Sequence, residues 1–155
     1  MTGPSAPARE TPTRLADYGF HYPITTRWAD MDIYGHVNNV VFYSFFDTAV
    51  NAFLMQSGVL DPARSPVIGL VVETRCAYFR SVEIPAPVTA GVRVARLGSS
   101  SVRYEIAIFQ GTDPTACAQG HFIHVYVDRE HRRPVPLPGA LRAALERLMS
   151  VPGID

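Results

Sequence analysis

The sequence contains little cysteine, and its two thiols show no metal-binding pattern. Cys76 and Cys117 stand far apart, with no Cys-x-x-Cys pair and no histidines at the spacing of zinc ligands. We therefore expect reduced, buried cysteines and no metal site. His121 and His124 do not change this expectation, because residues three apart on a strand point to opposite faces.

The sequence also lacks an excess of charge and any long apolar run. Lysine and arginine total 14, and aspartate and glutamate also total 14, so no global field favours nucleic acid or anionic lipid. A membrane-spanning helix needs about 18 or more consecutive apolar residues, and the chain has no such run. We expect a soluble, cytoplasmic protein that binds neither nucleic acid nor membrane.

The composition otherwise indicates one well-packed domain. A chain of 155 residues can bury about two-thirds of the surface that its unfolded form exposes. Apolar residues make up 47% and charged residues only 18%, which indicates that a partner subunit covers part of the apolar surface. Residues 1–16, rich in proline, threonine, alanine and arginine, are expected to form a disordered leader before a single domain over 17–150.

The segment 39–57 has the length and composition of a buried helix. Apolar side chains occupy nearly its whole circumference, and only a narrow polar stripe interrupts them. The stripe consists of Ser44, Asp47, Thr48 and Asn51. Asn38 or Asn39 can serve as the N-cap and Gly58 as the C-cap. We expect this helix to form the centre of the core.

The remainder of the domain has the pattern of β-strands. Residues 87–97 and 101–110 alternate apolar with polar side chains, so one sheet face is apolar and needs a cover. The expected strands cover 18–28, 67–79, 87–97, 101–110 and 115–128, and a short amphipathic helix covers 138–149. The helix at 39–57 is the one long apolar helix available. The sequence therefore predicts an α+β fold in which an antiparallel sheet wraps around one long central helix.

Two carboxylates and an imidazole lie immediately before this helix. Asp30, Asp32 and His36 fall in the run Arg-Trp-Ala-Asp-Met-Asp-Ile-Tyr-Gly-His-Val-Asn-Asn at 27–39. Backbone N–H groups at a helix start lack intrahelical partners, and together with the helix dipole they favour developing negative charge. A carboxylate beside such groups is typical of an acyl-transfer site.

Each of these residues also has a structural interpretation. Asp30 can pair with Arg27 or hydrogen-bond the loop backbone, and we assign it that role. His36 can brace the loop, contact a substrate or assist proton transfer, and we keep it as a catalytic candidate. Asn38 and Asn39 can act as helix caps.

The motif before the helix resembles that of the hotdog-fold acyl-CoA thioesterases of the 4-hydroxybenzoyl-CoA thioesterase class. It runs Arg27-x-x-Asp30-x-Asp32-x-x-Gly35-His36-Val37-Asn38-Asn39 and is followed by an aromatic helix. The element order, Tyr78, the turn after Leu97 and Arg133-Pro134-x-Pro136 are similar as well, over about residues 18–147. The resemblance implies a hotdog homodimer or homotetramer with active sites between subunits. No cofactor is expected.

The resemblance also assigns roles by position. Catalysis falls to Asp32, which is ionised at neutral pH and can attack a thioester carbonyl or deprotonate a water. Backbone N–H groups near Asn38, Asn39 and Val40 would hold the oxyanion. Val40 and Tyr43, in the first turns of the helix, can line an acyl pocket.

The chain departs from the family in its carboxylates. Some members carry the essential carboxylate as a glutamate inside the central helix, whereas this helix has only Asp47, more than two turns from its start. Glu73, on the next strand, is a second carboxylate that could approach the site across a dimer.

A second departure concerns recognition of coenzyme A (CoA). In the best-known members the 98–101 turn is basic and contacts the CoA phosphates, but here it is Gly-Ser-Ser-Ser. Ser100 and Ser101 are the substrate-binding candidates there, and Arg96, Arg103 or residues 131–133 could supply charge instead. An acyl-CoA and a carrier-protein thioester therefore both stay open as substrates.

Two competing functions remain at this stage. Enoyl-CoA hydratases share the fold, but their motif has a histidine five positions after the aspartate, whereas His36 follows Asp30 by six and Asp32 by four. A hotdog module that binds acyl thioesters without catalysis would retain its ligand without turnover. The sequence does not choose between aliphatic and aryl acyl groups.

Overall fold

A computed structural model describes residues 9–149 of the chain. The elements are η1 (Leu15–Asp17), β1 (Phe20–Ile24), η2 (Trp28–Asp30), α1 (Val41–Gln56), β2 (Val67–Tyr78), β3 (Val88–Leu97), β4 (Ser101–Gln110), β5 (Ala118–Asp128) and α2 (Gly139–Glu146). No helix within these residues is both long and apolar enough to cross a membrane.

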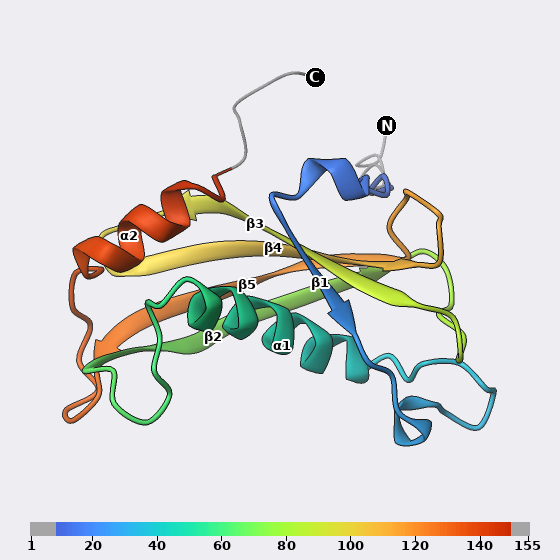
Figure 1. Ribbon diagram of the computed structural model, residues 1–155, viewed down its shortest axis with the longest axis horizontal. Helices are drawn as coiled ribbons and strands as arrows, with labels where there is room; N and C mark the ends of the chain where they lie inside the picture. Colours follow the sequence, from blue (N-terminus) through green and yellow to red (C-terminus); the bar gives the residue numbers. More distant parts are fainter. Residues whose placement is uncertain (1–8, 150–155) are drawn as a thin grey trace, which may run out of the picture.

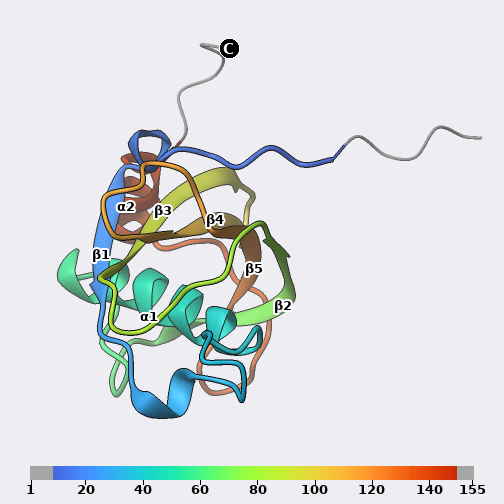
Figure 2. The same ribbon diagram turned by 90° about the vertical axis from the view of Figure 1, so that its right-hand side faces the viewer.

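The strands form one antiparallel sheet that curves around α1 (Figures 1 and 2). The strand order is β1-β3-β4-β5-β2, so β1 and β2 are the two edges. Buried aromatic side chains of α1 pack on the concave face of the sheet, where Phe46 lies 5.8 Å from Phe122 between ring centroids. The predicted α+β fold, with an antiparallel sheet wrapped around one long helix, is confirmed.

The central helix begins two residues later than predicted, because Asn38 forms the turn that precedes it. The Asn38 side-chain oxygen accepts the Val40 N–H at 3.2 Å, and its carbonyl accepts the Val41 N–H at 2.9 Å. At the other end Gly58 has a φ of +71°, a conformation that suits glycine after a helix, and donates to the Met55 carbonyl. Both ends lie within two residues of the prediction, but the N-cap is Val40, with no side-chain cap, instead of Asn38 or Asn39, and the C-cap is Ser57 instead of Gly58.

Residues 9–16, the second half of the predicted disordered leader, instead pack on the sheet. The Thr13 N–H donates to the Gln119 side chain at 2.7 Å, and the Leu15 N–H donates to the Pro114 carbonyl at 2.9 Å. This segment crosses the face of the sheet opposite α1, which we call the outer face (Figure 2). The prediction missed these contacts because they pair residues more than 95 positions apart. Residues 1–8 lie outside the described part of the chain.

The two histidines of β5 lie on different faces of the sheet, as strand alternation predicts. On the outer face, His121 lies between the Arg103 guanidinium at 3.2 Å and the Glu73 carboxylate at 2.8 Å. On the concave face, the His124 ring is buried, with its centroid 5.0 Å from that of Tyr104. A Cβ at Gly69 would lie 2.8 Å from His124 Nδ1, so this glycine leaves the space that the imidazole occupies.

Burial of His124 makes the stability of the fold depend on pH. Neither ring nitrogen has a hydrogen-bond partner within residues 9–149, and burial lowers the pKa of His124 to about 4. The unfolded chain would bind a proton near pH 6.5, so the unfolded state binds more protons between these values and stability falls as pH drops.

Because of this histidine alone, we expect the unfolding free energy to fall by about 2 to 3 kcal/mol when the pH is lowered from 7 to 4.5. Urea unfolding of the wild type and of His124→Phe at both pH values measures the effect, because phenylalanine fills the same space without titrating. The loss on acidification should be smaller in the variant by that amount. An equal loss in both proteins would contradict the assignment.

Candidate active site

The loop between β1 and α1 is a folded unit that presents Asp32 beside the start of the helix. The Asp32 N–H donates to the His36 carbonyl at 2.8 Å, and Gly35, with a φ of +77°, closes the turn between them. The Val37 N–H donates to the Val82 carbonyl at 2.8 Å, which joins this loop to the segment after β2. The residues on either side of Asp32 are therefore held by backbone hydrogen bonds.

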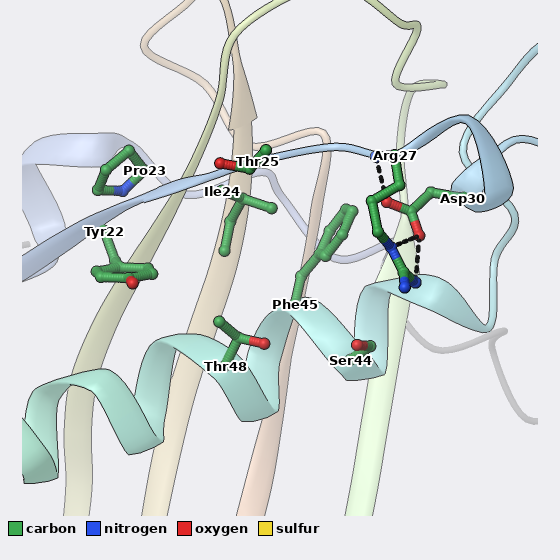
Figure 3. A pocket seen from close by; sticks show the side chains of 9 residues that line it. All are labelled: Tyr22, Pro23, Ile24, Thr25, Arg27, Asp30, Ser44, Phe45 and Thr48. Carbon is green, nitrogen blue, oxygen red and sulfur yellow. Dashed lines mark hydrogen bonds and ion pairs between the residues drawn. The ribbon is translucent and has the colours of Figure 1, made fainter.

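Asp30 is buried and has a structural role. Its carboxylate accepts the Arg27 backbone N–H at 2.7 Å and the Arg27 guanidinium at 2.9 Å, as the sequence predicted. Its carbonyl accepts the Asn38 N–H at 2.8 Å, which connects it to the helix entry. Figure 3 shows this pair at one end of a groove of about 350 Å³ between β1 and α1, into which Ser44 and Thr48 point.

Asp32 lies on the other side of the same loop and keeps one carboxylate oxygen unpaired. Its Oδ1 accepts the backbone N–H groups of Tyr34 at 2.8 Å and His36 at 3.3 Å. Its Oδ2 has no hydrogen-bond partner among residues 9–149. The carboxylate is thus oriented by one oxygen while the other is available for chemistry.

The Asp32 side chain borders a cavity of about 400 Å³ between the start of α1 and the end of β2. The lining residues are Asp32, His36, Val37, Asn39, Phe42, Tyr78, Phe79, Arg80 and Ser81. Phe42 and Tyr78 meet edge to face, with ring centroids 5.2 Å apart. The cavity combines an aromatic wall with a carboxylate and an imidazole, as a site for an acyl group next to a reacting carbonyl requires.

His36 stands at the rim of this cavity. Its Nε2 lies 3.7 Å from the Glu83 carboxylate, and the backbones of the two residues form an isolated bridge. The imidazole is partly exposed, so both substrate and solvent can reach it. This position agrees with the predicted placement of His36 beside Asp32 and leaves both a bracing and a chemical role open to it.

Two of the three predicted backbone donors at the helix entry are already engaged. The Asn38 N–H donates to the Asp30 carbonyl, and the Val40 N–H donates to the Asn38 side chain. The Asn39 N–H has no partner within residues 9–149, and Asn39 lines the cavity. Of the three predicted donors, Asn39 is therefore the one whose N–H is unpaired among residues 9–149.

Tyr78 fixes the position of this donor from the neighbouring strand. Its hydroxyl donates to the Asn39 carbonyl at 2.7 Å. Burial raises the pKa of Tyr78, so the phenol stays protonated at neutral pH and can donate this hydrogen bond. The end of β2 is thereby attached to the start of α1.

Phe79, like Tyr78, was considered from the sequence as an aromatic that could line an acyl pocket, whereas Arg80 and Ser81 were not predicted to be part of the site. Phe79, Arg80 and Ser81 line the cavity, and the Arg80 guanidinium is bound by Asp113 and by the Thr115 carbonyl at 2.7 Å. Their position follows from the β2–β5 pairing, which joins segments about 40 residues apart, so the local sequence carries no signal for it.

The other predicted substrate-binding residues lie elsewhere in the subunit. Ser100 and Ser101 lie at the opposite end of the sheet. Tyr78, at the cavity, pairs with Ala118 of β5, and Ala118 pairs with Ile108 of β4. Ser101 lies seven residues before Ile108 on β4, which corresponds to about 23 Å along the strand.

Two more predicted residues also point away from the cavity. The Glu73 carboxylate is on the outer face against His121. Tyr43 is partly buried and packs against the core, in contact with the rings of Phe46 and Phe122. Within one subunit, the predicted residues that lie together at the cavity are Asp32, His36 and Asn39, with Asn38 and Val40 beside them at the helix entry.

Comparisons with known proteins place these features in a family. Residues 26–145 match the model of the thioesterase-like superfamily. The structure resembles that of the PA5185 protein from Pseudomonas aeruginosa, with 52% identity, a TM-score of 0.87, and coverage of 90% of this chain and 97% of that one. It also resembles a Thermus thermophilus thioesterase complexed with coenzyme A and zinc, with 29% identity, a TM-score of 0.72, and coverage of 88% and 98%. The YsmA protein of Bacillus subtilis is 21% identical over 118 residues, which are 76% of this chain and 79% of that protein.

Proposed function

Since this chain belongs to the thioesterase-like superfamily and is a thioester hydrolase, we propose that its substrate is an acyl-CoA and that Asp32 activates the attack on the thioester. The observation that carries the proposal is the unpaired Oδ2 of Asp32 at the same cavity as the unpaired Asn39 N–H. The Thermus relative, whose structure contains coenzyme A, supports an acyl-CoA substrate. Within the superfamily, the Asp-x-Asp spacing before the helix favours the 4-hydroxybenzoyl-CoA thioesterase class.

Asp32 can act by either of two routes. As a nucleophile, its Oδ2 adds to the thioester carbonyl carbon, the C–S bond breaks, CoA leaves as a thiolate, and water hydrolyses the resulting anhydride. As a general base, Oδ2 takes a proton from a water that attacks the same carbon. In both routes a thiolate is a good leaving group, so the site needs no dedicated acid to protonate it.

The oxyanion is held by the Asn39 N–H in this proposal. A backbone donor of this kind typically stabilises the transition state by about 3 to 4 kcal/mol. Tyr78 contributes by holding the Asn39 carbonyl, and the dipole of α1 adds a favourable field at its N-terminus. His36, at the rim, is placed to contact the substrate or relay a proton.

We further propose that the protein is a homodimer or homotetramer whose subunits join along β2. The two sheet edges differ: β1 has five residues and contains Pro23, which lacks an N–H, whereas β2 has twelve residues and no proline. Val71 and Val72 on β2 are 46% and 60% exposed. A long, apolar strand edge without proline favours pairing with a second copy.

The proposal is tested by release of free thiol from a panel of aliphatic and aryl acyl-CoA substrates. We expect hydrolysis of at least one member at a rate proportional to enzyme concentration. Release of no thiol from any member would contradict it. Loss of enoyl absorbance without thiol release would indicate a hydratase instead, and retention of ligand without turnover would indicate a binding module.

A further inference from the structure

We propose that Glu83 is a positioning residue that acts through His36. Its carboxylate orients the imidazole at the rim of the active-site cavity, so that the ring nitrogen Nδ1 holds the water consumed in hydrolysis. The inference rests on the proposed function, since it takes Asp32 and His36 as parts of one hydrolytic site. Glu83 is not among the residues that line the cavity, so its effect reaches the substrate only through the imidazole.

The backbone places Glu83 directly opposite His36. The two residues form an isolated antiparallel bridge between the loop before α1 and the segment after β2. Residues that face each other in an antiparallel pair have Cβ atoms about 4.5 to 5.5 Å apart, so their side chains meet without any movement of the backbone. Here Glu83 Oε1 lies 3.7 Å from His36 Nε2.

The segment that carries Glu83 is fixed by its backbone. The Val37 N–H donates to the Val82 carbonyl at 2.8 Å, and the Val82 side chain is fully buried. The Glu83 N–H donates to the Gln110 side chain at 2.7 Å. These contacts do not use the Glu83 carboxylate, so replacing that side chain leaves the anchors of the segment in place.

Neither member of the pair has a competing side-chain partner. Among residues 9–149, no other hydrogen bond or ion pair engages the Glu83 carboxylate or the His36 ring. By contrast, the carboxylate of Glu73 is bound by His121 at 2.8 Å, on the outer face of the sheet. The charge of Glu83 is therefore directed at the imidazole alone.

The pair orients the ring and contributes little to the stability of the fold. The side chains of Glu83 and His36 are 68% and 41% exposed, and ion pairs between exposed groups stabilise proteins only weakly. Hydrogen bonds between catalytic groups are often long in the free enzyme and tighten when the substrate binds. A separation of 3.7 Å suits a contact of this kind.

The chemistry follows from the two ring nitrogens of His36. A carboxylate beside Nε2 favours the tautomer that carries its proton there, and Nδ1 then keeps its lone pair as an acceptor. Nδ1 lies on the backbone side of the ring, and the His36 backbone N–H donates to Asp32 Oδ1 at 3.3 Å. A water that donates to Nδ1 and to the unpaired Oδ2 of Asp32 is held in the cavity that both residues line. Both routes of hydrolysis consume such a water.

The first test measures kcat and KM of Glu83→Ala and Glu83→Gln with an acyl-CoA that the wild type hydrolyses. We expect Glu83→Ala to lower kcat about tenfold, a part of what an acid–base group contributes, and to leave KM unchanged. Glu83→Gln should keep most of kcat, because its amide oxygen still accepts the Nε2 proton. Wild-type kcat in Glu83→Ala, or equal losses in the two variants, would overturn the proposal.

Glu146→Ala is the matched control. It removes an exposed carboxylate from α2, which lies at the end of the sheet remote from the start of α1 (Figure 1). This variant should keep the kcat and KM of the wild type. Thermal unfolding of every variant verifies that the differences in kcat do not come from unfolded protein.

The second test asks whether Glu83 acts through His36. We expect His36→Ala to lower kcat at least as much as Glu83→Ala does. In the His36→Ala background, Glu83→Ala should then cause no further loss, because no imidazole is left to orient. Losses that multiply in the double variant would show that Glu83 acts independently of His36, and a His36→Ala variant with wild-type kcat would show that there is nothing to position; either result rejects the proposal.

The third test observes the imidazole directly and does not depend on activity. Long-range ¹H–¹⁵N spectra at alkaline pH report which ring nitrogen carries the proton, and His36→Ala identifies the His36 signals. We expect the proton on Nε2 in the wild type and a shift of these signals in Glu83→Ala. A proton on Nδ1, or identical His36 signals in the two proteins, would contradict the proposed contact.

These measurements also separate the inference from the proposed function. If the wild type hydrolyses an acyl-CoA and Glu83→Ala matches it, the proposed function stands and only the role of Glu83 fails. If the wild type hydrolyses no thioester, the proposed function fails, and the positioning role that rests on it fails with it.

Discussion

Replacing Asp32 with asparagine is expected to lower kcat for thioester hydrolysis by about 100- to 10,000-fold. The amide keeps the size of the side chain and an oxygen for the Tyr34 and His36 N–H groups, so the loop should stay folded. It loses the ionised oxygen that attacks the carbonyl or deprotonates water. Thiol release under saturating substrate measures the effect, and circular dichroism with thermal unfolding verifies that the variant is folded.

The neighbouring carboxylate provides the contrasting variant. Asp30→Asn should lower the unfolding free energy by about 1 to 3 kcal/mol, because Asp30 is buried and its carboxylate pairs with Arg27. At a temperature where the variant is folded, its kcat should stay within a few fold of the wild type. Near-wild-type activity of Asp32→Asn, or a larger loss of kcat in Asp30→Asn, would remove Asp32 from the proposed mechanism.

Replacing Val72 with arginine is expected to convert the oligomer into monomers and to abolish most activity. Val72 is 60% exposed on the edge strand β2, and a charge placed at an apolar strand edge opposes pairing with a second chain. Multi-angle light scattering measures the mass, and thiol release measures the activity. Loss of activity should accompany dissociation, because the family resemblance implies active sites that lie between subunits.

The opposite edge of the sheet supplies the control. Thr25 is exposed just beyond β1, and Thr25→Arg adds the same charge there without reaching β2. This variant should keep the mass and activity of the wild type. A wild-type protein that is monomeric and fully active would contradict both the β2 interface and the shared active site.

Local patterns in the sequence were enough to predict the elements of the fold. The alternation along 87–97 and 101–110 follows from the two-residue period of strands. The apolar composition of 39–57 follows from the burial of most of its circumference, while a stripe that includes Ser44, Asp47 and Thr48 is exposed. The positions of Asn38 in the turn before the helix and of Gly58 just after its C-cap follow from their own side-chain and backbone chemistry. The pairing of Asp30 with Arg27 was predictable because the two residues are only three apart.

By itself, then, the sequence determined the element types, the antiparallel sheet around one helix, and the placement of Asp32 and His36 beside the helix entry. Only the tertiary structure decided that Tyr78 binds the Asn39 carbonyl, that residues 9–16 pack on the outer face, and that Ser100 lies at the far end of the sheet. The reason is physical. Helix and strand periods are set by residues a few positions apart, whereas these contacts depend on strand order and register between segments distant in the chain.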